Sequence, residues 1–132
     1  MGSQGIFLGQ TPGFVQQHRP FVGPQGQQAG QRLLPEGWVA GSTAISATYR
    51  AGATSDDKNP NGWMWWLNQA PREGFEPPWP DAPLDAYSAI GHWGQYVVVV
   101  PSRDVVIVRT GDDRDDGISL NQLISLSLKV AQ

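Results

Sequence analysis

Two apolar runs near the end of this 132-residue sequence limit its fold more than any other feature. Val97–Val100 and Val105–Val108 flank four residues that are typical of a turn, Pro101 to Asp104. This pattern predicts a β-hairpin with strands at about 95–100 and 105–110. Because the valines do not alternate with polar residues, both faces of the sheet need to be covered.

A C-terminal amphipathic helix is expected to cover one of those faces. Ser119 and Gln122 have the spacing of a capping box, which predicts where the helix begins. The apolar residues that follow lie on a single stripe: Leu120, Leu123, Ile124, Leu128 and Ala131. No other segment is long enough to cover the second face. We therefore expect one side of the hairpin to be an exposed apolar patch that promotes association.

The middle of the sequence predicts shorter elements. Pro35 and Glu36 suit a first helical turn, and Asn61-Gly62 is a turn signal before an aromatic run. The expected elements are a short helix at about 35–43, a loop over 51–62, a strand over 62–69, a proline-rich loop over 71–83 and a strand at about 86–91. The fold class is α+β, with an antiparallel sheet of three to four strands and the C-terminal helix packed on one face.

The N-terminal segment differs from the rest. Residues 1–31 contain eight Gln, seven Gly and three Pro. A segment with so few apolar side chains gains little from burial and loses much backbone entropy on ordering. We expect a disordered or loosely attached tail over 1–30, without a strand at Ile6 to Leu8, and a domain over 31–132.

Composition excludes several classes of function. A formal net charge of −3 and a pI near 5.1 argue against nucleic-acid binding, which requires a basic face. No apolar run approaches the length of a membrane span, so no membrane partner is expected. The absence of cysteine excludes disulfides, thiolate catalysis and thiolate metal sites.

Four segments, in order, carry a resemblance to a known family. They are GQRLLPEGW, WMWWLN, GHWGQYVVVVPSRDVVIVR and the terminal helix. Together they resemble the C-terminal part of β-lactamase-related serine hydrolases, a group that includes class C β-lactamases, esterases and 6-aminohexanoate-dimer hydrolases. The resemblance covers about residues 30–131, and H-W-G-Q before the hairpin is its most specific element.

The resemblance implies an acyl-transfer site at this motif. His-x-Gly would lie on the innermost strand of the sheet of a β-lactamase-like α/β lobe, and the N–H of Gln95 would donate to the oxyanion. Gly94 would allow close approach of substrate, and His92 would help to hold a catalytic tyrosine and substrate oxygens. Trp93 and Tyr96 are the candidate substrate-binding residues, with packing as the simpler role for Trp93. A structural histidine is the simpler interpretation of His92.

Two catalytic elements of that family have no credible counterpart. Ser55 and Lys58 have the spacing of Ser-x-x-Lys, but they lie in a polar loop where the lysine would stay hydrated. None of Tyr49, Tyr87 and Tyr96 is followed two residues later by asparagine. The chain is therefore expected to be inactive alone and to need the missing helical lobe as its partner. Its parent would act on a small amide or ester.

No cofactor or metal is expected. The acidic residues that precede the last helix suit capping and the helix dipole better than a metal: Asp112, Asp113, Asp115 and Asp116. Two alternatives stay open, a split protein whose helical lobe is a separate chain and a small α+β module that binds a glycan or peptide. The aromatic groove of such a module would be framed by Trp63, Trp65, Trp66, Trp79 and Trp93.

Overall fold

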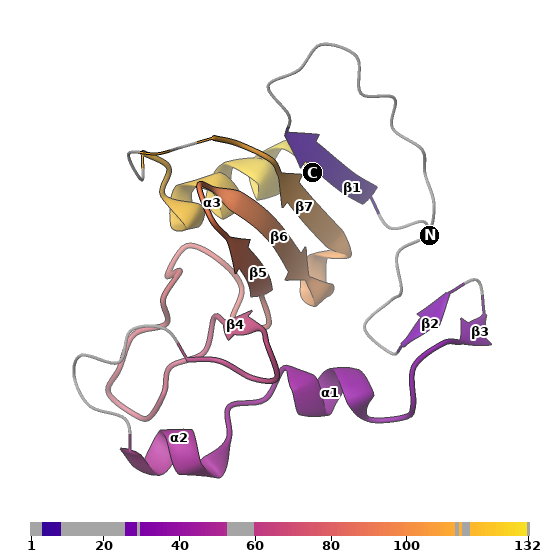
Figure 1. Cartoon of the computed structure of the whole chain (residues 1–132), viewed down its shortest axis with the longest axis vertical. Coiled ribbons are helices and arrows are strands. Elements are labelled where there is room, and N and C mark those ends of the chain that lie inside the picture. Colours follow the sequence, from indigo (N-terminus) through magenta and orange to yellow (C-terminus); the bar gives the residue numbers. More distant parts are fainter. Residues whose placement is uncertain are drawn as a thin grey trace.

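A computed structural model describes residues 4–8, 26–28, 30–52, 60–112, 114 and 117–131. Its elements, in chain order, are β1 (Gln4–Leu8), β2 (Gln27–Gln28), β3 (Gln31–Arg32), α1 (Trp38–Ser42), α2 (Ala47–Gly52), β4 (Trp66–Leu67), β5 (Tyr87–Gly91), β6 (Gln95–Val100), the 3₁₀-helix η1 (Pro101–Arg103), β7 (Val105–Arg109) and α3 (Leu120–Val130). Figure 1 shows a central sheet with α3 against it and the two shorter helices beside β4.

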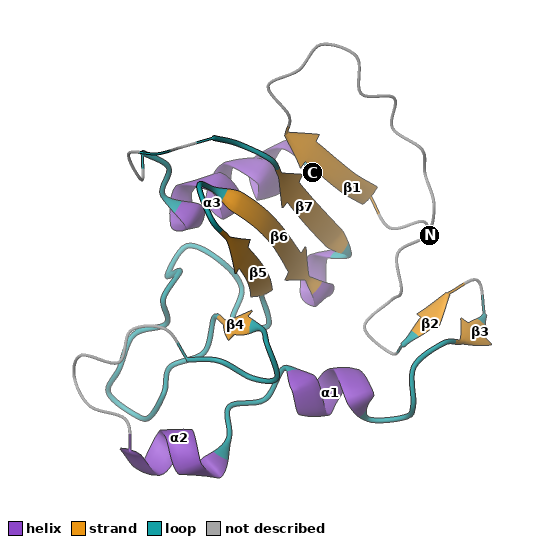
Figure 2. Ribbon diagram, in the orientation of Figure 1, coloured by secondary structure: helices purple, strands orange, loops and turns teal. Residues whose placement is uncertain are grey.

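The main sheet has the strand order β1-β7-β6-β5-β4. Its four strands from β4 to β7 pair in antiparallel fashion, and the parallel strand β1 joins the outer edge of β7. A separate two-stranded sheet consists of β2 and β3 (Figure 2). The predicted α+β class, with an antiparallel sheet and a C-terminal helix packed on it, is confirmed.

The valine hairpin forms as predicted. β6 and β7 pair from Tyr96 opposite Arg109 to Val100 opposite Val105. The intervening residues form η1, and Asp104 closes the connection with a φ of 51°, a left-handed conformation that Asp tolerates better than most residues.

The first face of this hairpin packs against α3. Val98, Val100 and Ile107 are fully buried there together with Ile124 of the helix. Burial of one such side chain stabilises the fold by about 1.5–3 kcal/mol. The predicted start of the helix is confirmed, since the Oγ of the N-cap Ser119 accepts a hydrogen bond from the Gln122 N–H.

The second face is covered at one end, which corrects the expectation that no segment covers it. Val99 and Tyr87 are 5% and 7% exposed there. The side chains that cover them come from the chain between α1 and β4 and from β4 itself: Ile45, Tyr49, Trp65 and Leu67. Several short segments thus supply the cover that we expected to require one long helix.

Coverage is thinner at the other end of the same face, near the turn between β5 and β6. Ala89, Val97 and Val108 form one row across the three strands, and each is half-buried. Even this end is only partly exposed, so a half-buried row stands where an exposed apolar face was predicted.

The predicted strand over 62–69 is wrong except at Trp66–Leu67. The Trp63 N–H donates to the Ser42 carbonyl at 2.9 Å, and Met64 has a φ of 67°. A Cβ on Gly62 would lie 2.0 Å from the Ser42 carbonyl oxygen, so glycine is required there. The backbone at 62–64 therefore turns against the end of α1, with the Gly62 N–H bonded to the Trp65 carbonyl, and does not extend into a strand.

Two other predicted boundaries also move. The helix expected at 35–43 is restricted to Trp38–Ser42, because Gly37 occupies the N-cap with a left-handed φ of 75°. The loop expected over 51–62 begins after Gly52, since α2 includes Ala51 and Gly52, and residues 53–59 lie outside the described part of the chain.

The N-terminal segment contributes structure that we did not predict. Gln4–Leu8 forms β1, paired in register with β7 from Gln4 opposite Val105 to Leu8 opposite Arg109. The outer edge of β7 would otherwise present unpaired backbone groups, which is the physical reason that an added strand is favourable there. The other residues between 1 and 25 lie outside the described part of the chain, so the expected disorder and the boundary at residue 30 stay predictions.

Asn68 ties the proline-rich loop to the sheet. The loop is confirmed, since residues 68–86 contain no helix or strand. The fully buried Asn68 amide donates to the carbonyls of Trp79, Ala82 and Pro83 at 2.9–3.1 Å and accepts from the Trp79 N–H at 2.7 Å. This arrangement brings Trp79 into the cluster beneath α3.

Candidate functional site

The His-Trp-Gly motif lies in the turn between β5 and β6. His92, Trp93 and Gly94 connect the two strands, so the expectation that the motif lies on a strand is not met. Trp93 and Gly94 have φ values of 56° and 80°. Left-handed conformations reverse the chain over a few residues, and glycine adopts them without the steric cost of a Cβ.

The side chains of this turn face solvent. His92 is exposed, and its ring centroid lies 4.9 Å from that of Trp93. The Arg114 guanidinium lies 4.1 Å from the Trp93 ring centroid, a cation–π contact, and Arg114 also pairs with Asp112 at 3.1 Å. Trp93 therefore contacts its own chain on one face and is still 44% exposed.

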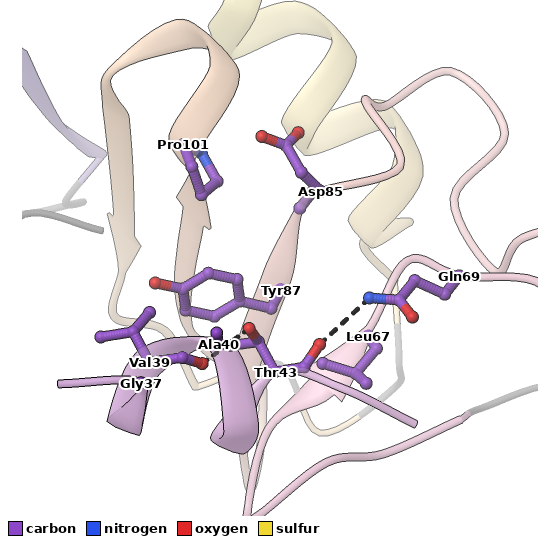
Figure 3. A pocket seen from close by; sticks show the side chains of 10 residues that line it. Gly37, Val39, Ala40, Thr43, Leu67, Gln69, Asp85, Tyr87 and Pro101 are labelled. Carbon is purple, nitrogen blue, oxygen red and sulfur yellow. Dashed lines mark hydrogen bonds between the residues drawn. The ribbon is translucent and has the colours of Figure 1, made fainter. Parts of the chain in front are cut away.

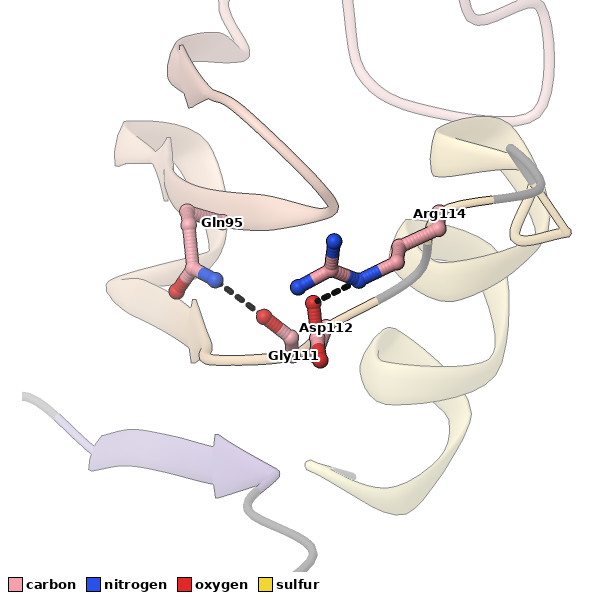
Figure 4. A network of polar contacts seen from close by, with 4 residues as sticks. All are labelled: Gln95, Gly111, Asp112 and Arg114. Carbon is pink, nitrogen blue, oxygen red and sulfur yellow. Dashed lines mark hydrogen bonds and ion pairs between the residues drawn. The ribbon is translucent and has the colours of Figure 1, made fainter.

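Residues at and beyond the end of β7 hold the turn in place. Arg109 donates from Nη1 to the Gly94 carbonyl oxygen at 2.6 Å, and the Gln95 side-chain amide donates to the Gly111 carbonyl (Figure 4). Arg109 is only 5% exposed. Sequence reasoning missed this residue, although a charged side chain two residues after Ile107 on a buried strand was a usable signal.

The predicted site residues divide between the two faces of the sheet. Tyr96 is half-buried and packs against the cluster beneath α3. Side chains alternate along a strand, so Gln95 points to the opposite face. A substrate at the Gln95 side would therefore not contact the Tyr96 side chain directly.

The polar residues that the sequence offers for a nucleophile or a metal are either exposed or outside the described part of the chain. Asp112 is exposed and paired with Arg114. Ser55, Lys58, Asp113, Asp115 and Asp116 lie outside the described part of the chain. Within the described part, no three His, Asp or Glu side chains gather as metal ligands would.

A pocket of about 220 Å³ lies at the start of β5, the end opposite to His92. Figure 3 shows the side chains that line it. Its walls include Val39, Asp85, Tyr87 and Pro101. Burial, and then the charge of Asp85, raise the pKa of the Tyr87 phenol above its usual 10.0. None of the site residues predicted from the sequence lines this pocket, and no sequence motif marks it.

The tryptophans do not form the single groove that the binding alternative requires. Trp79 is buried beneath α3, and Trp65 packs edge-on against Tyr87 with centroids 4.9 Å apart. A smaller exposed aromatic surface does exist, where Trp38 and Trp63 meet edge to face at 5.5 Å. Met64 lies beside Trp63 in the chain and is 94% exposed.

No protein-family model and no curated protein matches the sequence. Among the helices of the described residues, none has the length and apolar character needed to cross a lipid bilayer.

Proposed function

We propose that this chain is the C-terminal part of a serine hydrolase of the β-lactamase-related family, whose parent cleaves an amide or ester through an acyl-enzyme. The observation that carries the proposal is the Gly94–Gln95 peptide at the end of the sheet, where Arg109 contacts the Gly94 oxygen and Gln95 stands opposite Gly91 of β5. This peptide carries the N–H that the resemblance designates as an oxyanion donor.

The chemistry of such a site divides between this chain and the lobe that would complete it. The lobe would supply the serine and its base. This chain would supply the Gln95 N–H, which stabilises the charge that develops on the carbonyl oxygen in the tetrahedral intermediate. Exposed His92 would face the same substrate from the turn. The half-buried row Ala89, Val97 and Val108 is the natural surface for the lobe to cover.

A chimeric enzyme tests the proposal. Residues 61–131 of this chain would replace the corresponding strands and helix of a β-lactamase-related esterase, with hydrolysis of a p-nitrophenyl ester and labelling by a fluorophosphonate as measurements. Gln95→Pro deletes the proposed donor N–H, whereas Gln95→Ala keeps it and serves as the matched control. We expect Gln95→Pro to lower kcat by about 10²–10³-fold.

Three outcomes would count against the proposal. A folded chimera without activity would exclude membership of this family, and an active chimera indifferent to Gln95→Pro would exclude the donor role. Ester hydrolysis by the chain alone that disappears in Ser55→Ala would show that Ser55 was dismissed wrongly. The upstream DNA offers a further check, since a helix with Ser-x-x-Lys followed by Tyr-x-Asn is expected there in one reading frame.

The exposed pair Trp38 and Trp63 favours a second candidate function, binding of a glycan or peptide. Both rings are about half exposed, and an exposed aromatic ring offers a broad apolar surface for such a ligand. Tryptophan fluorescence of the chain should then shift saturably with ligand, and Trp63→Ala should abolish the shift. Trp93→Ala, at the distant turn, is the control that should retain it.

A further inference from the structure

The pocket at the start of β5 takes no part in the proposed hydrolase chemistry. It has a volume of about 220 Å³, and its walls come from α1, from β4, from β5 and the chain that precedes it, and from η1 (Figure 3). An apolar cavity of about 150 Å³ holds one benzene ring, so this pocket has room for a ring with a short side chain. Its size therefore favours a ligand of about eight to ten non-hydrogen atoms.

One part of the wall is apolar. Val39 and Ala40 contribute to it from α1, Leu67 from β4 and Pro101 from η1. Leu67 is only 1% exposed and belongs to the core cluster on this face of the sheet, so the pocket reaches down to that core. A ligand with an apolar body would gain free energy here, because its surface would leave water for an apolar wall.

The pocket also carries a negative charge. Asp85 is the one ionised side chain among the described residues that line it. Ser102 holds this carboxylate, which accepts from the Ser102 N–H at 2.6 Å and from the Ser102 Oγ at 2.9 Å. No Lys, Arg or His side chain in the described part of the chain pairs with Asp85. A carboxylate has about four lone-pair sites, so two of them are left for a cationic ligand.

The Tyr87 phenol is a second polar group of the pocket. Tyr87 is 7% exposed, yet its hydroxyl makes no hydrogen bond with the described residues. Figure 3 shows the phenol ring between Pro101 and α1, with Asp85 from the same end of β5. The charge of Asp85 acts on the pKa of this phenol, so the two groups lie near one another. A nearly buried hydroxyl needs a partner, which water or a ligand can supply.

We propose that this pocket binds a small primary ammonium on an apolar body of one-ring size, with Asp85 as its counter-ion and the Tyr87 oxygen as a second acceptor. An ammonium has three donors, so it can bond to both oxygens at once. A ligand with a carboxylate would be repelled by Asp85, and no cation in the wall would offset that repulsion. The site does not depend on the hydrolase proposal, because it would bind its ligand in this chain alone.

Nuclear magnetic resonance titration of the full chain with phenethylammonium, near neutral pH, tests the proposal. We expect saturable shifts of the backbone amides that line the pocket, among them Val39, Thr43 and Ala86, with a Kd of about 1 mM or below. 2-Phenylethanol has the same body without the charge and should bind about 10-fold more weakly. 3-Phenylpropanoate has the opposite charge and should give no saturable shift. Equal binding of the amine and the alcohol, or shifts away from the pocket, would overturn the proposal.

Asp85→Asn removes the charge and keeps an oxygen that can accept from Ser102. This variant should bind the amine about 10-fold more weakly and the alcohol as before, so that the two ligands become nearly equal. Asp81→Asn is the matched control, since Asp81 is an exposed carboxylate that also accepts a hydrogen bond but does not line the pocket. An unchanged amine affinity in folded Asp85→Asn would refute the counter-ion role. If Asp85→Asn does not fold, the comparison of the three ligands on the wild type decides the result.

Tyr87→Phe tests the second acceptor, because it removes the phenol oxygen and keeps the ring. We expect the amine affinity to fall by about 3- to 10-fold. Tyr96→Phe makes the same change on the opposite face of the sheet, beneath α3, and should leave the affinity unaltered. If Tyr87→Phe and Tyr96→Phe both bound the amine like the wild type, the proposed position of the ammonium would be wrong.

Discussion

Removal of the Asn68 side chain should lower the free energy of unfolding by several kcal/mol, because among the described residues this one amide makes all the side-chain bonds between the end of β4 and the proline-rich loop. Asn68→Ala deletes the donor to the carbonyls of Trp79, Ala82 and Pro83 and leaves the Trp79 N–H without its acceptor. Lost hydrogen bonds cost about 1 kcal/mol each, and a buried unsatisfied N–H adds about 1–3 kcal/mol. Because the Asn68 amide has only two hydrogens to share among the three carbonyls, the sum is about 3–5 kcal/mol, a large share of the roughly 5–15 kcal/mol that stabilises a typical domain.

Urea denaturation followed by tryptophan fluorescence would measure this loss. With an m-value of about 2 kcal/mol/M, the midpoint should fall by about 2 M. Gln69→Ala is the matched control, because this neighbouring amide is half-buried and makes a bond to the Thr43 carbonyl. Its cost should stay near 1 kcal/mol. If Asn68→Ala were no worse than Gln69→Ala, the view that Asn68 holds the proline-rich loop would be wrong.

Three further predictions concern single side chains. Gly94→Ala should cost about 1–2 kcal/mol, because alanine is strained at a φ of 80°, and calorimetry should show a Tm lower by several degrees; an unchanged Tm would contradict the left-handed turn. Ser127→Ala should be neutral or stabilising by up to about 1 kcal/mol, since the buried Ser127 Oγ has no hydrogen-bond partner among the described residues; a clear loss in urea denaturation would reveal one. The raised pKa of Tyr87 means that the folded state retains a proton that the unfolded state releases near pH 10, so stability should fall as the pH rises above 10. Ultraviolet titration should show the Tyr87 pKa falling in Asp85→Asn but remaining above 10, because burial is the larger cause; a Tyr87 that titrates normally in the wild type would refute this.

The elements that could be predicted from the sequence are those specified by their own residues. The two apolar runs define the β6–β7 hairpin, and Ser119 with Gln122 defines the start of α3. The residues at 62–64 could not be placed in this way, since the bond from the Trp63 N–H goes to Ser42, about twenty positions earlier. Local propensity favoured a strand there, and a tertiary contact prevented it.

The candidate site was predictable in part for the same reason. Gly94 marked the turn, because glycine suits a left-handed backbone. The left-handed Trp93 was not foreseeable, as such a conformation is rare for a large side chain. Arg109 and Gly111 support the turn through contacts that depend on how β7 is aligned with β6. The sequence of one strand does not determine that alignment.

The valine run of β6 has a consequence for pairing. Because consecutive valines alternate between the two faces, a shift of β6 by one residue against β7 would replace most buried valines with identical ones. The middle of β6 therefore packs nearly as well in either alignment. The native alignment is specified at the ends of the strand, by the turn at Gly94 and the 3₁₀-helix at Pro101. Insertion of one extra valine would leave the composition of the interior almost unaltered, yet it would rotate Gln95 to the opposite side of the sheet.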